Sequence, residues 1–180
     1  MADDAVKLYN EALSLELDIR SDVPANELYR IYNGVGASWM KAEWRKFLDG
    51  MFEEILPAVL GHDLDYAYGN GTFENFRAAN ARLEKNGRIC ADTKYPWWRP
   101  KRYIVRRKAR LCRKVCDAFG FPAYAAAIDE TKQHNNAKKQ GGRKWNTATE
   151  HQRLVRGKAW ESWGVYDQHA ARSIGRLRWR

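Results

Sequence analysis

The 180-residue sequence predicts an all-α protein, in which a small helical domain over residues 1–132 precedes a basic, partly extended arm over residues 133–180. Apolar residues recur in several segments at a spacing of three to four, which is typical of one face of a helix. No pair of segments shows the alternation expected of paired strands. After residue 132 the apolar pattern weakens, and residues 131–180 carry 12 Lys and Arg against 3 Asp and Glu.

The front of the domain is expected to contain three helices and a loop. Over 3–20 the apolar spacing is helical and an Asp at the start can cap the first turn. A second helix, over 24–31, begins at Pro24, a residue suited to the first turn of a helix. Before a partial helix over 39–48, residues 32–37 read Tyr-Asn-Gly-Val-Gly-Ala. Two glycines one residue apart allow positive φ and let a ligand approach the backbone.

Two core helices are predicted next. The stronger covers 51–68, where an apolar stripe keeps helical spacing and Pro57 indicates a kink or a restart. The other covers 73–85 and is expected to end at Asn86-Gly87, a pair that commonly terminates helices. The first of them carries a His-Asp pair, His62-Asp63, and the two core helices are expected to surround this site.

The rear of the domain is expected to hold a loop and two further helices. The loop covers 88–100 and contains Trp97-Trp98. In the helix over 103–119, the apolar residues are expected to face inward: Ile104, Cys112, Val115 and Phe119. The last helix covers 122–132 and begins after Gly120.

Charge is unevenly distributed. Residues 1–87 carry 9 basic against 15 acidic side chains, whereas the rest of the chain is strongly basic and the total is +10. A basic rear half favours a polyanionic partner, which is nucleic acid, an anionic membrane or an acidic protein surface. A solvated, solubilising tail is the alternative. The tryptophans among the arginines of the arm suit contact with a nucleic-acid backbone, and they suit docking onto a larger assembly equally well.

Targeting signals are not predicted. The acidic start of the chain lacks the pattern of a signal peptide, and no apolar run is long enough to span a membrane. Three cysteines form no regular disulfide framework, which favours synthesis in a reducing cytoplasm.

The segment from His62 to Tyr66 has the form H-D-x-x-Y on a predicted helix. His62 and Tyr66 share one face of that helix, whereas Asp63 points about a quarter turn away. The imidazole can therefore address a substrate while the carboxylate of Asp63 addresses a cation. A hard cation such as Ca²⁺ prefers oxygen ligands, which the glycine loop can supply from its carbonyls. This combination suits ester hydrolysis, with His62 as the base for an attacking water. A histidine on an apolar helix face is otherwise an ordinary core residue.

The loop Tyr32-Asn33-Gly34-Val35-Gly36, followed by the H-D-x-x-Y helix, resembles the calcium loop and catalytic helix of the phospholipase A2 superfamily. The likeness is greatest to the viral and phage forms and covers residues 29–126. It implies that His62 is the general base and that Asp63 is the calcium carboxylate. It further implies that Tyr66 holds the residue that orients His62. The remaining calcium ligands would be the carbonyls of Tyr32, Gly34 and Gly36.

One position departs from that pattern. Where the family places an Asp on the next helix, this sequence has Asn80, which accepts a hydrogen bond but carries no charge. Asp92 or Asp117 could replace the missing carboxylate, although neither spacing argues for it. The resemblance implies a calcium-dependent hydrolase of glycerophospholipid sn-2 esters, found in a virion or the host cytoplasm and acting at a phospholipid membrane surface.

The departure at Asn80 leaves an alternative. The chain could be a basic virion-structural protein that binds nucleic acid or virion proteins through its arm and has a degenerate catalytic face. Trp97-Trp98 among basic residues is consistent with an anchor at a lipid interface, and equally with a plug in the core.

Overall fold

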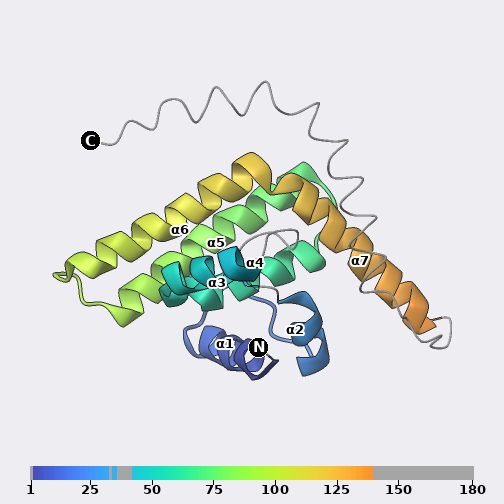
Figure 1. Cartoon of the computed structure of the whole chain (residues 1–180), viewed down its shortest axis with the longest axis horizontal. Coiled ribbons are helices and arrows are strands. Elements are labelled where there is room, and N and C mark those ends of the chain that lie inside the picture. Colours follow the sequence, from blue (N-terminus) through green and yellow to red (C-terminus); the bar gives the residue numbers. More distant parts are fainter. Residues whose placement is uncertain (1, 33, 36–41, 140–180) are drawn as a thin grey trace. The chain divides into compact units, whose positions relative to one another are not determined.

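The computed structural model describes residues 2–32, 34–35 and 42–139, and no strand occurs within these ranges. The predicted all-α class is confirmed (Figure 1). Among the helices in these ranges, none is long and apolar enough to cross a bilayer. In chain order the elements are α1 (Ala2–Ser14), α2 (Ala25–Ile31), α3 (Ala42–Met51), the 3-10 turn η1 (Glu53–Ile55), α4 (Leu56–Ala67), α5 (Phe73–Lys94), α6 (Pro100–Phe119) and α7 (Phe121–Lys139).

The centre of the domain is α5, which packs against α6 on one side and α4 on the other, while α1 covers α4 (Figure 1). One apolar cluster joins these helices, with Ile55 and Val59 before and within α4, Leu83 in α5, and Val105 and Ala109 in α6. The restart expected at Pro57 is present, since η1 ends and α4 begins beside it. The two predicted core helices are thus α4 and α5.

The expected stop at Asn86-Gly87 is wrong, because α5 continues through both residues to Lys94. Gly87 lies against α6, where an added Cβ would stand 2.6 Å from the Cβ of Ala109. The buried side chain of Asn86 accepts a hydrogen bond from the Asp18 N–H at 3.0 Å and donates one to the Asp18 carbonyl at 3.1 Å. Both residues therefore serve packing between elements, and the loop to α6 is shorter than predicted.

The inward face of α6 also differs from the prediction. Ile104 is 55% exposed and Val115 is 49% exposed. The fully buried positions are Val105 and Ala109, which are small enough to bring α6 close to α5. In the preceding loop, Trp97 and Trp98 are 69% and 65% exposed, so they do not plug the core.

The ends of the domain differ in length from the prediction. The first helix ends at Ser14 instead of near residue 20, and Glu16 just beyond it has a positive φ of 53°. The last helix, α7, continues past residue 132 to Lys139. The chain divides into compact units over 1–133 and 134–180, and residues 140–180 of the predicted arm lie outside the described residues.

Candidate functional site

Three predicted site residues meet between α4 and α5. The His62 Nε2 lies 2.9 Å from the side-chain oxygen of Asn80, and the Tyr66 hydroxyl donates to the same oxygen at 2.9 Å. His62 and Tyr66 are one helical turn apart, and their ring centroids are 4.0 Å apart. Asn80 is fully buried in α5. The structure thus brings together the imidazole, the phenol and the amide that the sequence singled out.

Asp117 of α6 completes this group. Asn80 donates from its side-chain nitrogen to the Asp117 carboxylate at 2.8 Å. The other carboxylate oxygen of Asp117 lies 3.4 Å from Arg113 Nε. The sequence offered Asp117 only as an alternative, because its contact with Asn80 spans 37 positions. One signal was available, since Asp117 is the single acidic residue within α6.

The hydrogen bonds fix the tautomer of His62. A carboxylate only accepts, so Asn80 must direct its NH₂ group toward Asp117 and its carbonyl oxygen toward α4. That oxygen cannot donate, so the ring proton of His62 must sit on Nε2. The lone pair is then on Nδ1, which makes no hydrogen bond to the part of the chain that the structure describes. A neutral imidazole with a fixed Nε2–H and a free Nδ1 lone pair is in the form required of a general base.

The surroundings of His62 favour its neutral form. Burial lowers the pKa of His62 to about 4, partly offset by the hydrogen bond to Asn80. The positive charge of Arg82 also lowers this pKa, and the negative charge of Asp117 raises it by a smaller effect. Burial raises the pKa of Tyr66, so its hydroxyl stays protonated and remains a donor. The site therefore supplies a base at neutral pH but stabilises the protonated ring poorly.

The glycine loop is held by a carboxylate that the sequence did not single out. The Val35 N–H donates to Asp49 of α3 at 2.6 Å. Gly34 has a φ of 82°, and an added Cβ would lie 2.8 Å from the Asp49 carboxylate oxygens. Glycine is thus required at position 34 both by its conformation and by the close approach of Asp49.

The start of the loop lies beside the helix that carries Asp63. Tyr32 packs against an apolar cluster that includes Leu60 and Leu64 of α4. The pKa of Tyr32 is raised, first by burial and then by the negative charges of Asp49 and Asp63. Both carboxylates therefore act on the same phenol, and Asp63 itself is half-exposed.

The predicted calcium ligands are all oxygen atoms. The carboxylate of Asp63 and the carbonyls of Tyr32 and Gly34 suit a hard cation such as Ca²⁺ and do not suit zinc. Gly36, the third predicted carbonyl ligand, lies outside the described residues. Within the described ranges no three His, Cys, Asp or Glu side chains gather as a metal cluster. A cation at Asp63 would therefore need further oxygen ligands, which the loop carbonyls would have to supply.

Comparison with known proteins returns no match: no protein-family model, no curated protein and no solved structure is significantly similar to the chain.

Proposed function

We propose that the chain is a phospholipase A2-type hydrolase that cleaves sn-2 esters of glycerophospholipids with Ca²⁺. The observation that carries the proposal is the network of His62, Asn80, Tyr66 and Asp117. This network holds the ring proton of His62 on Nε2, so that the lone pair is on Nδ1. The resemblance of the loop and the H-D-x-x-Y helix to viral and phage phospholipases supports the choice of substrate.

The residues would act as follows. Nδ1 of His62 takes a proton from a water molecule as that water attacks the ester carbonyl. Asn80 holds Nε2–H through its oxygen, and Tyr66 and Asp117 hold the amide in this orientation. The proton passes to the leaving alcohol, which yields a fatty acid and a lysophospholipid. Ca²⁺ held by Asp63 and the loop carbonyls would polarise the ester and stabilise the oxyanion.

A second candidate is favoured by the chemistry of Asn80. A neutral amide beside His62 leaves the imidazolium without a contacting counter-ion, which agrees with the lowered pKa. Residues 131–180, which include the arm, carry 12 basic against 3 acidic residues. In this alternative the chain is a basic virion-structural protein that binds nucleic acid or virion proteins, and its hydrolase face is vestigial. In either case we place the protein in a virion or the host cytoplasm.

The hydrolase is tested by fatty-acid release from phosphatidylcholine with Ca²⁺ and with a chelator. Wild type should release fatty acid only with Ca²⁺, and His62→Gln should lose the activity. The same substitution at His134, outside the network, should leave it unchanged. Absence of release by wild type, or equal release by His62→Gln, contradicts the hydrolase.

The binding alternative has its own measurement. Salt-sensitive binding of an oligonucleotide should be present in the full chain and lost in a chain that ends after Lys139. Such binding together with an inactive wild type would favour the alternative over the hydrolase.

A further inference from the structure

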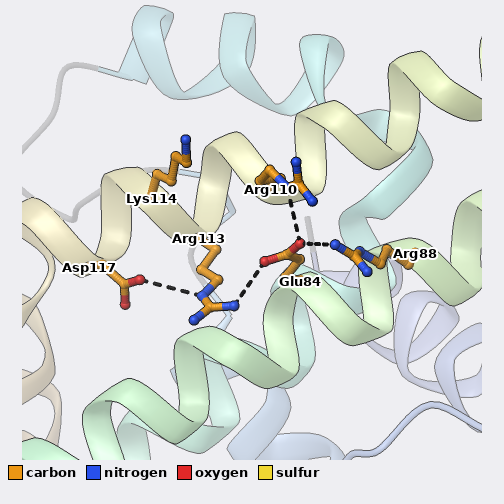
Figure 2. A pocket seen from close by; sticks show the side chains of 6 residues that line it. All are labelled: Glu84, Arg88, Arg110, Arg113, Lys114 and Asp117. Atoms are coloured by element: carbon orange, nitrogen blue, oxygen red, sulfur yellow. Dashed lines mark hydrogen bonds and ion pairs between the residues drawn. The ribbon is translucent and has the colours of Figure 1, made fainter. Parts of the chain in front are cut away.

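A pocket of about 360 Å³ opens between α5 and α6, and its lining is charged (Figure 2). It lies on the Asp117 side of Asn80, so it is separate from the His62 ring. Four cations and two carboxylates line it: Arg88, Arg110, Arg113, Lys114, Glu84 and Asp117.

Glu84 is the internal counter-ion of the pocket. Its side chain is only 9% exposed, and it accepts a hydrogen bond from Arg113 at 3.0 Å. It also pairs closely with Arg88, one turn further along α5. Figure 2 shows these arginines and Arg110 directed at the same carboxylate. These contacts lower the pKa of Glu84 despite its burial, so it is charged at neutral pH.

The lining of the pocket carries more positive charge than is needed to neutralise Glu84. Arg110 stands 3.5 Å from Glu84 with its side chain 61% exposed, which is a weak contact. Lys114 makes no ion pair with the described residues. Clustered cations repel one another, so a surplus beyond the internal carboxylates is unfavourable unless an external anion offsets it. Structural compensation of Glu84 accounts for Arg88 and Arg113 but leaves Arg110 and Lys114 unexplained.

We propose that this pocket binds a phosphate group, carried by a soluble phosphate ester or by a lipid headgroup. Arginine presents a planar fork of N–H donors that matches two phosphate oxygens, and lysine adds a compact charge. Arg110 and Lys114 lie one helical turn apart at the exposed rim, where an incoming phosphate would meet them first.

The test is direct binding of inorganic phosphate and of glycerol 3-phosphate to the full chain by calorimetry. The double substitution Arg110→Gln/Lys114→Gln removes two exposed positive charges and should weaken phosphate binding at least about tenfold. Its matched control is Arg77→Gln/Arg107→Gln, which removes the same charge from exposed positions of α5 and α6 outside the pocket. The control should bind like wild type. Equal weakening in both doubles, or no binding by wild type to phosphate or to vesicles, overturns the proposal.

Vesicles distinguish the two sources of phosphate. Sedimentation is compared between phosphatidylcholine vesicles with and without phosphatidic acid. A lipid headgroup is supported if phosphatidic acid increases binding and only the pocket double loses that increase. A soluble ester is supported if only the small phosphates depend on the pocket. None of these measurements requires ester hydrolysis, so they test the proposed phosphate site independently of the proposed hydrolase activity.

A third variant should change phosphate affinity in the opposite direction. Glu84→Gln removes the internal counter-ion, so Arg88 and Arg113 become available and phosphate binding should tighten several-fold. If the arginines served only to compensate Glu84, this variant would bind phosphate no better than wild type. Circular dichroism checks that the Glu84→Gln variant remains folded. If it does not, Arg110→Gln/Lys114→Gln alone tests the proposal.

Discussion

Asn80 donates its side-chain N–H to Asp117 at 2.8 Å, so the carboxylate of the network stands one amide away from His62 instead of in contact with it. An amide in this position can hold the ring by a hydrogen bond but cannot offset the charge that the ring acquires when it takes a proton. The arrangement separates two tasks that one carboxylate could perform together, namely orientation and charge stabilisation.

Exchanging the two side chains moves the charge next to His62. In Asn80→Asp/Asp117→Asn, the hydrogen bonds can be kept while the carboxylate contacts Nε2 directly. We expect the pKa of His62 to rise by about 1–3 units, since an opposite charge in contact favours the protonated ring. NMR titration of the histidine measures this shift, and the proposed hydrolase should become faster.

The single variants provide the controls for this exchange. Asn80→Asp alone sets two carboxylates at hydrogen-bond distance, so one should take up a proton and the gain should be smaller. Asp117→Asn alone removes the negative charge of Asp117, which raises the pKa of His62, so this variant should not raise that pKa. If the exchange leaves the pKa of His62 unchanged, the network does not control the ring.

Acid should destabilise the protein through His62. Its folded pKa of about 4 is below the ordinary value of 6.5, so the unfolded chain binds this proton more readily. Stability from this residue is therefore present above pH 6.5 and is lost as the pH falls toward 4. The loss is about 3 kcal/mol at most.

Urea unfolding of wild type and His62→Gln at several pH values between 7 and 4 measures this effect. The glutamine variant should lose less stability across that interval. Parallel pH profiles in the two proteins would show that the folded ring takes up a proton as readily as the unfolded one. Carboxylates with lowered pKa, such as Glu54 and Asp92, act at lower pH and are common to both proteins.

Local patterns in the sequence predicted the helical class and the pairing of His62 with Tyr66, because both depend on helical periodicity. The partner Asn80 followed only from the resemblance to phospholipases, as the position on the next helix where that family places an Asp. Asp117 was only one of two alternatives and Asp49 was not singled out, since each acts through a contact with another segment of the chain. Periodicity reports which residues share a face and does not report which face meets another helix.

The errors at Gly87 and Ile104 have a common origin. A glycine within a helix indicates a stop when only the chain itself is considered, but it also allows a neighbouring helix to approach. Once α6 lies close to α5 at Gly87 and Ala109, the inward face is made of small residues. The larger apolar side chains of α6, Ile104 among them, are then left at the surface. Tertiary packing, which the local sequence does not encode, decided both positions.

Calcium binding should depend on Asp63. In isothermal titration, Asp63→Asn should bind Ca²⁺ at least about tenfold more weakly than wild type, because a hard cation loses its charged ligand. The control is Asp65→Asn, which is on the same helix but pairs with Arg82 at 2.7 Å. Equal calcium affinity in wild type and both variants would exclude Asp63 as a ligand, whether or not the protein hydrolyses lipids.

The exposed Trp97-Trp98 pair should anchor the protein to lipid. The two rings contact edge to face, with centroids 5.9 Å apart, in a loop flanked by basic residues. Trp97→Ala/Trp98→Ala should weaken binding to anionic vesicles by about tenfold or more, because each indole would lose its burial at the interface. Tyr29→Ala/Phe47→Ala, which removes exposed aromatic residues elsewhere, should have little effect. Equal losses in the two doubles would indicate nonspecific hydrophobic adsorption.

Two glycine substitutions should change stability in opposite directions. In Gly87→Ala the added methyl would lie 2.6 Å from Ala109, so α5 and α6 must separate. We expect a loss of about 1–3 kcal/mol, even though alanine favours the helix. In Gly50→Ala, within α3, the methyl meets nothing within 4 Å, and the same change should stabilise by about 0.5–1 kcal/mol. Chemical denaturation measures both. A stabilised Gly87→Ala would mean that α5 and α6 are not in close contact at this point, and the explanation of the continuous α5 helix would then be wrong.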